Sequence, residues 1–481
     1  MGAKKTFFIS TSIPYVNAKP HIGHVLEFVQ TDVLARYHRS QGDQVYFLSG
    51  TDDNASKNVQ AAEAASLAVA DYVNQKAMDF KNLLQKLNIS NDDFIRTSID
   101  KRHLIGAQKL WLACKKDDIY KKKYKGFYCV GCEEFKTEKD LLNGACPLHP
   151  GKKLETVEEE NYFFKLSNYQ KVLEDLISTD TLKIIPETRK REAMSFIKSG
   201  LEDFSISRSK TRSKNWGIPV PKDKNQIIYV WFDALSNYTN ALGYGEESEN
   251  YKKFWENGDD RVHVIGKDIN RFHTIYWPAM LMSAGVKAPT KAVIHGFITI
   301  AGQKMSKSVG NVIDPSTILD EYGVDATRYI FTREISTFED GDLTLEKIKE
   351  AYNANLANGL GNLVSRILKM AQTHLEKPVE IEESKLPEEY CSYLEKYEIQ
   401  KAADFVWKEI TDIDLQIQQE EPFKAVKEHK ETGQALIRNL VHRLYKVAEM
   451  LAPLLPETSE KIKNLVKENK MPEKPLFPRK D

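Results

Sequence analysis

Two short segments, far apart in the chain, carry side chains suited to phosphate chemistry. PHIGHVLEF, residues 20–28, places His21 and His24 three positions apart with Gly23 between them. GQKMSKSVGN, residues 302–311, places Lys304 and Lys307 between two glycines. Imidazole N–H and ammonium groups can stabilise negative charge that develops on a phosphate. Either segment alone would indicate ordinary surface residues. Together, in one α/β chain, they predict that both segments bind one nucleotide.

The residues around the histidines predict the elements that hold them. KTFFISTSI is β-branched and aromatic and reads as a strand, VLEFVQTDVLARYHRSQG has helical spacing, and DQVYFLSG reads as a second buried strand. The histidines then lie at the amino terminus of a helix that follows a strand, where backbone N–H groups favour phosphate. Gly23 would allow the nucleotide to approach the backbone closely.

Four cysteine and histidine residues have the spacing of a metal site. Cys129 and Cys132 form a C-x2-C pair, Cys146 and His149 form a C-x2-H pair, and 13 residues separate the pairs. Such pairs converge on tetrahedral Zn²⁺. A full set of four protein ligands leaves no position for substrate, so we expect one structural zinc ion per chain. A redox pair or unliganded core cysteines are the alternatives, and neither accounts for the second pair.

Length and composition place few further limits on function. The chain has 481 residues, which at about 150 residues per domain suggests three domains. Its net charge is zero, which neither supports nor excludes nucleic-acid binding. No run approaches the ~18 apolar residues of a membrane span, and the five cysteines form no disulfide framework. We therefore expect a cytoplasmic protein without a membrane partner.

The order of elements predicts two architectures in one chain. Residues 5–115 read as α/β, with a helix over 60–87, and strand-like runs return at 227–238, at 261–269 and in KAVIHGFITI. A turn-rich insertion containing the cysteines interrupts this pattern. After residue 345 apolar residues recur every three or four positions, which predicts a helical bundle. The polar, proline-rich end, KENKMPEKPLFPRKD, is expected to be frayed.

The combination of HIGH and KMSKS resembles the class I aminoacyl-tRNA synthetases. FISTSIPYVNAKPHIGH, SGTDD, SISR, IYVWFDALSNY and HVIGKDINRFHTIYWPAMLMSAG are similar to segments of the methionyl-tRNA synthetases with one zinc knuckle, and the resemblance covers essentially the whole chain. It implies that methionine and Mg²⁺-ATP form methionyl-adenylate, from which methionine is transferred to tRNA(Met). The first step needs no general base, because the attacking carboxylate is already ionised.

The same resemblance assigns roles to individual residues. Asp52 should bind the α-ammonium of methionine, and Arg208 should face methionine and ATP. An aromatic and aliphatic pocket suits a thioether. Carried over position by position, the catalytic residues are His21, His24, Lys304 and Lys307; the ATP site adds Gly23 and Asp268; the methionine site contains Ile13, Tyr15, Asp52, Arg208, Trp231, Ala234, Tyr238, Ile269 and His273.

In the bundle, the resemblance points to residues that read the anticodon. Asn358, Asn362 and Arg366 recur every four residues on one helical face, and Phe423 stands where many relatives have a tryptophan that stacks on a base. The glycines at 359 and 361 lower helix propensity and would permit close approach by a partner. A second departure is Asn54-Ala55, where relatives commonly have histidine and glycine. We expect a monomer, because the domain through which some relatives dimerise does not follow.

The expected fold is a Rossmann-like α/β catalytic domain with a zinc-knuckle insertion, followed by an all-α anticodon-binding bundle. The expected boundaries are 1–115 and 225–300 for the catalytic domain, 116–224 for the insertion with its knuckle at 129–149, 301–345 for the KMSKS loop and stem-contact region, and 346–481 for the bundle.

Two other hypotheses remain at this point. A synthetase for leucine, isoleucine or valine would carry a large editing insertion, for which the chain has no room, and one for cysteine would use a zinc ion with an open position. An inactive paralogue that binds tRNA is the third possibility. The intact HIGH, KMSKS and Asp52 argue against it.

Overall fold

The computed structural model describes residues 4–136, 138–147, 149, 151–304, 312–381 and 385–481. The chain divides into two compact units. The sheet unit contains residues 1–20, 42–85 and 90–295, and the helical unit contains residues 21–41, 86–89 and 296–481. Each is described separately below.

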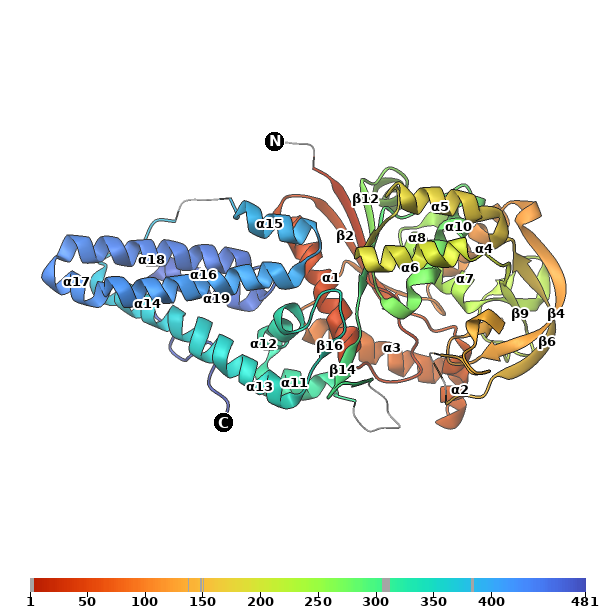
Figure 1. Cartoon of the computed structure of the whole chain (residues 1–481), viewed down its shortest axis with the longest axis horizontal. Coiled ribbons are helices and arrows are strands. Elements are labelled where there is room, and N and C mark those ends of the chain that lie inside the picture. The colour runs from red at the N-terminus through yellow and green to blue at the C-terminus, as the bar shows by residue number, and fades with distance from the viewer. Residues whose placement is uncertain (1–3, 137, 148, 150, 305–311, 382–384) are drawn as a thin grey trace. The chain divides into compact units, whose positions relative to one another are not determined.

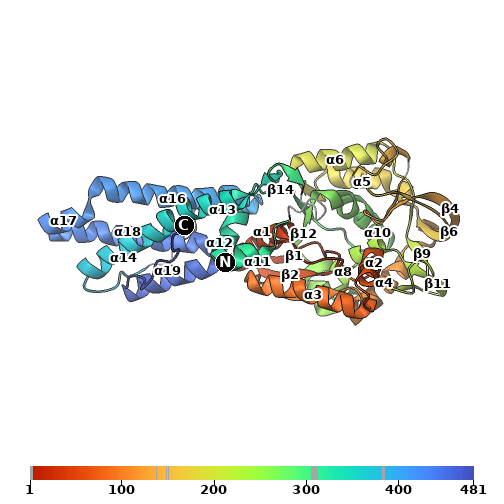
Figure 2. The ribbon, with the colours of Figure 1, turned by 90° about the horizontal axis from the view of Figure 1, so that it is seen from below.

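A six-stranded parallel sheet forms the centre of the sheet unit, as the sequence predicts (Figure 2). Strand β1 pairs with β2 on one side and with β12 on the other, so Phe8 lies between Tyr46 and Arg261. The chain order reverses at β1, and ligands of such sheets bind beyond the carboxyl ends of the strands at this point. The sheet order is β3 (Asp93–Arg96), β2 (Gln44–Thr51), β1 (Thr6–Ser10), β12 (Asp260–Gly266), β13 (Lys291–His295) and β7 (Lys183–Ile185).

Two predicted elements differ from the observed ones. The strand predicted over 227–238 ends at Ile228, where β11 (Asp223–Ile228) gives way to helices α7 (Val230–Leu235) and α8 (Asn237–Asn240). Residues 226–244 are all buried, so the run lacks the alternation that separates strand from helix. The helix predicted over 60–87 is two helices, α2 (Ser56–Ala64) and α3 (Val69–Lys86).

The insertion consists mainly of small antiparallel sheets and two helices. Long paired strands β4 (Ile119–Cys129) and β6 (Glu155–Phe164) lead into and out of the cysteine segment. The remaining elements are β5 (Glu134–Lys136), β8 (Phe204–Ser205), β9 (Ser207–Ser209), β10 (Pro219–Val220), α5 (Gln170–Ser178) and α6 (Glu187–Lys198).

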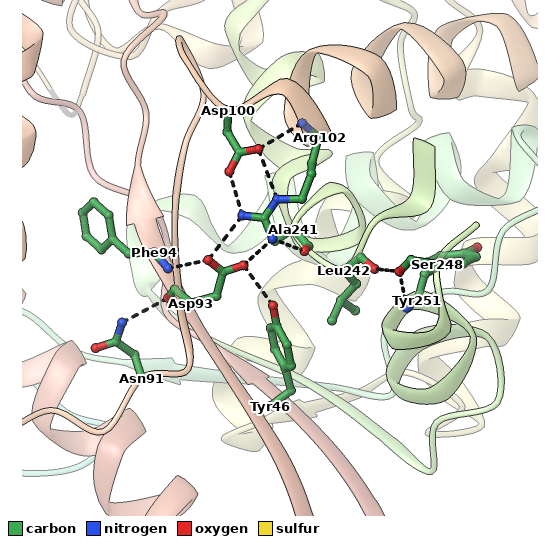
Figure 3. A network of polar contacts seen from close by, with 10 residues as sticks. All are labelled: Tyr46, Asn91, Asp93, Phe94, Asp100, Arg102, Ala241, Leu242, Ser248 and Tyr251. Atoms are coloured by element: carbon green, nitrogen blue, oxygen red, sulfur yellow. Dashed lines mark hydrogen bonds and ion pairs between the residues drawn. The ribbon is translucent and has the colours of Figure 1, made fainter. Parts of the chain in front are cut away.

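A polar network centred on Arg102 fastens helix α4 (Lys101–Ala113) to the edge of the main sheet (Figure 3). The guanidinium donates from Nη1 to Asp93 Oδ2 at 2.8 Å and to the Ala241 carbonyl at 2.8 Å, and from Nη2 to Asp100 Oδ2 at 2.7 Å. Tyr46 also donates to Asp93 Oδ2, at 2.9 Å. The Asp93 carboxylate on β3 thus joins β2 to α4, and Arg102 joins α4 to the chain after α8.

Replacing Asp93 by asparagine is expected to lower the free energy of unfolding by about 2 kcal/mol. The amide would turn an N–H group toward donors that now share a carboxylate. Urea denaturation of Asp93→Asn beside Asp117→Asn, which makes the same change at an exposed residue, checks this. Equal denaturation midpoints for the two variants would show that the network contributes nothing.

A bundle of helices dominates the helical unit, as predicted (Figure 1). Helix α18 contacts α14, α16 and α19 along the bundle. The helices are α1 (Ile22–Ser40), α11 (Pro315–Tyr322), α12 (Val324–Tyr329), α13 (Leu345–Ala351), the π-helical η9 (Tyr352–Gly361), α14 (Asn362–His374), α15 (Glu388–Glu395), α16 (Ile399–Glu420), α17 (Pro422–Glu428), α18 (Lys430–Leu451) and α19 (Pro456–Glu468).

A buried ion pair joins α1 to the rest of the helical unit. Arg328 and Asp32 are both fully buried, and Arg328 Nη1 lies 2.7 Å from Asp32 Oδ2. The other guanidinium nitrogens donate to the carbonyls of Leu454 and Pro453, each at 2.9 Å. Because every group of the guanidinium reaches an acceptor, the charge is compensated in the interior.

The prediction of a frayed end is wrong. Phe477 is buried, and its neighbour Pro478 accepts a hydrogen bond from the Tyr352 hydroxyl at 2.8 Å. Asn353 exchanges two hydrogen bonds with the backbone of Lys480, at 2.7 and 2.9 Å. A Cβ atom at Gly361 would lie 3.7 Å from the backbone nitrogen of Phe477. The Leu356 carbonyl of the same helix would lie closer, at 3.0 Å, so the space at this glycine is taken by its own helix and by the end of the chain.

Among the described residues, no helix is long and apolar enough to cross a membrane.

Candidate active site

Several predicted methionine-site residues directly follow strands of the main sheet, at the carboxyl ends of those strands. Ile13 and Tyr15 follow β1, Asp52 follows β2, and Ile269 follows β12. Tyr15 and Asp52 form a parallel bridge, in which the Asp52 N–H donates to the Pro14 carbonyl at 2.9 Å. Parallel pairing of β1 with both neighbours brings their carboxyl ends together.

Asp52 is a buried carboxylate without a paired cation among the described residues. Its side chain accepts a hydrogen bond from the Asn54 N–H at 3.0 Å. Burial raises the pKa of Asp52 well above its usual value, and the nearby Asp233 carboxylate raises it further, although the Asn54 N–H acts in the opposite direction. A bound ammonium group would favour the charged form of Asp52 and would therefore lower its pKa again.

The other two carboxylates in this region have partners of their own. Arg96 donates from Nε and Nη2 to Asp53 Oδ2, at 3.0 and 2.7 Å. His103 Nε2 makes a short contact with Asp233 Oδ1. Asp233 Oδ2 accepts from Asn54 Nδ2 at 2.7 Å. Asp52 is therefore the one of the three that can offer its charge to a ligand.

Sequence analysis missed Asp233 and His103. An aspartate inside the apolar run YVWFDAL signals a buried acid that needs a partner. The partner could not be identified, because His103 lies 130 residues earlier in the chain.

Aromatic rings form the wall of the predicted methionine pocket. The Trp231 indole stacks on Phe272, with ring centroids 3.7 Å apart and planes inclined by 2°, and Tyr15 meets Trp231 edge-on at 6.3 Å. Ala234 is buried on the next turn of α7. Phe272 was not among the predicted residues, although it lies beside His273 in NRFHTIYW. Such a wall suits a thioether.

Hydrogen bonds fix the tautomer of a neutral His273 ring. Its Nδ1 lies 3.0 Å from the Ile269 carbonyl, which can only accept, so Nδ1 carries a proton. In the neutral ring Nε2 then accepts from the Tyr238 hydroxyl at 2.7 Å. The neighbouring His263 is also held by a hydroxyl, with Nδ1 2.8 Å from Ser10 Oγ, and burial lowers the pKa of His263 well below its usual value. Burial therefore favours the uncharged form of His263, and the two hydrogen bonds of His273 fit a neutral ring protonated on Nδ1.

Arg208 packs among aromatic rings of the insertion. Its guanidinium carbon lies 4.1 Å from the centroid of the Tyr229 ring and 4.7 Å from that of Phe135. Nη1 donates to Ser205 Oγ at 2.9 Å, whereas Nε and Nη2 have no hydrogen-bond partner in the part of the chain that the structure describes. Two unsatisfied buried donors leave capacity for an anionic ligand.

The HIGH histidines form a reciprocal cap at the amino terminus of α1. His21 Nδ1 accepts from the Gly23 N–H at 3.1 Å, and His24 Nδ1 accepts from the His21 N–H at 3.0 Å. Since both Nδ1 atoms accept, each neutral ring carries its proton on Nε2. The cap thus prepares two Nε2–H donors at a helix end that favours anions.

The second predicted phosphate-binding segment is only partly described. The backbone of Lys304 lies in β15 (Gln303–Lys304), paired antiparallel with β14 (Ile298–Ile300), and β14 also pairs with β16 (Gly341–Asp342). Lys307 lies outside the described residues. Asp268, predicted for ATP, follows β12 in η6 (Lys267–Ile269) and is exposed.

The predicted metal ligands converge. The ligand atoms of Cys129, Cys132, Cys146 and His149 all lie within 4.8 Å of one another. His149 Nδ1 is 3.4 Å from Cys132 Sγ and 3.8 Å from Cys129 Sγ. A Cβ at Gly131 would lie 2.4 Å from the His149 ring, so the glycine makes room for this ligand. Three sulfurs and one nitrogen at this spacing could hold a metal ion.

Three of the predicted anticodon residues follow one another along η9 and α14. Asn358 and Asn362 are exposed, whereas Arg366 forms an ion pair with Asp414 of α16. Phe423, on α17, is 40% exposed, which leaves a ring face that could stack on a base.

Comparison with known proteins supplies independent evidence. Residues 7–152 and 149–368 match the family model described as tRNA synthetases class I (M). A methionine–tRNA ligase of Fusobacterium nucleatum is 40% identical over 478 residues, spanning 96% of this chain and 74% of the relative. One from Synechocystis sp. is 40% identical over 482 residues, spanning 95% of this chain and 88% of the relative.

Solved structures give the same picture. Mycobacterium tuberculosis methionyl-tRNA synthetase in complex with methionyl-adenylate is 34% identical, with a TM-score of 0.89 over 99% of this chain and 100% of that chain. The apo form of the same enzyme is 31% identical, with a TM-score of 0.83 over 99% of each chain.

Proposed function

Because the chain belongs to the methionine–tRNA ligase family of class I tRNA synthetases, we propose that it activates L-methionine with ATP and transfers the methionyl group to tRNA(Met). The observation that carries the proposal is a buried carboxylate, Asp52, at the sheet edge that also holds the aromatic wall. An amino acid brings the ammonium group that such a site lacks.

Methionine-, leucine- and cysteine-dependent pyrophosphate exchange, measured side by side on the purified protein, tests this function. We expect exchange with methionine alone. Exchange driven by leucine or cysteine would reassign the substrate, and ATP binding without any exchange would indicate an inactive tRNA-binding paralogue.

In the amino-acid site, Asp52 pairs with the α-ammonium, and the side chain of methionine occupies the pocket. The aromatic wall suits an apolar thioether, and the hydrogen bond between Tyr238 and His273 satisfies the polar groups of this wall. Arg208, with two free donors, faces the anionic side of the reactants. The residues that bind methionine are Ile13, Tyr15, Asp52, Arg208, Trp231, Ala234, Tyr238, Ile269 and His273.

In the ATP site, His21 and His24 donate Nε2–H hydrogen bonds to the α-phosphate. The methionine carboxylate attacks the α-phosphorus, the bond to the bridging oxygen breaks, and pyrophosphate leaves with its electron pair. Lys304 and Lys307 hold the leaving phosphates, Gly23 allows close approach of the nucleotide, and Asp268 contributes a polar contact. Mg²⁺, bound with ATP, would neutralise phosphate charge. These roles require positioning and charge stabilisation rather than a base.

In the knuckle, Cys129, Cys132, Cys146 and His149 hold one structural Zn²⁺. When bound, the ion would cross-link the two turns of the cysteine segment between β4 and β6. We propose that the zinc ion has no part in the chemical step, because four protein ligands fill its coordination sphere.

Changing Cys146 to serine is expected to reduce bound zinc from about one ion per chain to nearly none, because a neutral hydroxyl replaces a thiolate ligand. Elemental analysis of the purified variant measures this. The matched control is Cys391→Ser, which makes the same change at a cysteine far from the knuckle in sequence and should leave the metal content unchanged. Full zinc occupancy in Cys146→Ser would remove Cys146 from the ligand set.

The bundle recognises the anticodon through Asn358, Asn362, Arg366 and Phe423. Amide and guanidinium groups on a helix suit the edges of splayed bases, and an exposed ring suits stacking. The proposed domains are 1–115 with 225–300 for catalysis, 116–224 for the insertion, 301–345 for the KMSKS region and 346–481 for the anticodon. We propose that the protein acts as a cytoplasmic monomer.

A further inference from the structure

Glu133, the residue after the metal-ligand candidate Cys132, is a buried carboxylate that none of the roles above uses. It is 1% exposed and has a φ of +56°, which is uncommon for a residue with a side chain. Its Oε2 accepts from Ser56 Oγ at 2.6 Å, and its Oε1 accepts from the Lys57 N–H at 2.8 Å. The Tyr128 hydroxyl also donates to Oε2, at 2.5 Å.

The bond from the Lys57 N–H caps a helix that cannot cap itself, and the bond from Ser56 Oγ adds a side-chain contact in the same turn. Ser56 and Lys57 are the first two residues of α2, and its N-cap, Ala55, has no side-chain acceptor. A carboxylate at this position satisfies a free backbone N–H and interacts favourably with the helix dipole. The knuckle therefore supplies the cap for a helix that begins four residues after Asp52.

The first turn of α2 holds the backbone of Asp52. Asn58 Nδ2 donates to the Asp52 carbonyl at 2.9 Å, and the Asn58 N–H donates to the Ala55 carbonyl at 3.0 Å. One turn of α2 thus connects the Glu133 carboxylate, which caps the helix, to Asp52.

Cys132 and Glu133, two adjacent knuckle residues, also accept hydrogen bonds through their backbone carbonyls from aromatic side chains beside the pocket. The Trp231 indole N–H donates to the Cys132 carbonyl at 3.3 Å, and the Tyr229 hydroxyl donates to the Glu133 carbonyl. One dipeptide of the knuckle therefore contacts both sides of the amino-acid site: the helix behind Asp52 and the indole of the pocket.

We propose that Glu133 is a positioning residue for methionine binding. Glu133 couples the knuckle to the amino-acid site through α2 and through the Tyr229–Trp231 segment. The inference rests on the proposed methionine activation. Apart from the bond from Tyr128, the contacts of Glu133 lead to α2 beside Asp52 and to the Tyr229–Trp231 segment, and among the described residues none of them is with His21 or His24. Loss of Glu133 should therefore affect methionine binding more than ATP binding.

Glu133→Gln tests this inference. The glutamine keeps the size of the side chain but turns an N–H group toward donors that now meet an oxygen. We expect the KM for methionine in pyrophosphate exchange to rise about tenfold, with kcat and the KM for ATP changed less than about twofold. The metal content should stay at the wild-type value. Glu133→Asp, which keeps the charge but is one methylene shorter, should give an intermediate KM.

Glu138→Gln is the matched control, since it makes the same change at an exposed knuckle residue and should behave as wild type. An unchanged KM for methionine in Glu133→Gln, or an equal rise in the KM for ATP, would overturn the inference. If Glu133→Gln does not fold, Ser56→Ala removes one donor from the other side and should raise the KM for methionine about threefold; no rise would again overturn it. Absence of exchange in the wild type would instead reject the proposed function.

Discussion

Replacing Asp52 by asparagine is expected to lower kcat/KM for methionine in pyrophosphate exchange by about a thousandfold, or about 4 kcal/mol. The amide keeps the shape of the side chain and can still accept from the Asn54 N–H, so the backbone should remain in place. It removes the charge that the ammonium of methionine requires. The KM for ATP should change little.

A substrate without the ammonium group supplies the control. Binding of 4-(methylthio)butanoate, which is methionine without its amino group, should be about equal in wild type and Asp52→Asn. The pair of ligands and the pair of proteins form a cycle that isolates the interaction between the carboxylate and the ammonium. An equal loss of affinity for both ligands would show that Asp52 does not bind the amino group.

The pH dependence of methionine binding follows from the same residue. Burial and the nearby Asp233 raise the pKa of Asp52, so its proton is taken up at a higher pH than that of an ordinary carboxyl group. The KM for methionine should therefore rise as pH falls through this raised pKa. In Asp52→Asn that acid limb should disappear.

Replacing His24 by asparagine is expected to slow adenylate formation about a hundredfold in single-turnover measurements, with little change in methionine affinity. Asparagine retains an acceptor near the position of Nδ1 and can preserve the cap to the His21 N–H. It has no donor at the position of Nε2. The loss should therefore appear in the rate and not in the stability of the helix.

His24→Gln makes the opposite change. Its amide nitrogen can take the position of Nε2, while the acceptor that caps the helix is lost, so the rate should fall less than in His24→Asn. The free energy of unfolding should fall by about 1 kcal/mol. Equal rates in the two variants would contradict the role of the Nε2–H group.

Features carried by local patterns could be predicted from the sequence. Runs of β-branched and aromatic residues predicted the parallel strands around β1, helical periodicity predicted the bundle, and short ligand spacing predicted the knuckle. The helix after Ile228 could not be predicted, because a run that is buried on every side has no period. The docked end was also missed, because Phe477 packs against residues more than a hundred positions earlier.

The hydrogen-bond partners of the polar site residues could not be predicted from the sequence either, because they lie far away along the chain. Asn54 departs from the family pattern, yet its amide bonds to Asp233, 179 residues away. Glu133 reaches Lys57 across 76 residues. Neither contact has a local signature. Such pairs are set by the fold, and only the presence of a buried acid in an apolar run gives a sign that a partner exists.

The Asp32–Arg328 pair has a consequence for anyone wishing to shorten this enzyme. Residues 1–295 would retain the histidine-bearing helix but would lose Arg328, and the fully buried Asp32 carboxylate would lose the ion pair that it makes with this guanidinium. A minimal activating fragment should therefore keep α12, or replace Asp32 with a neutral residue of similar size.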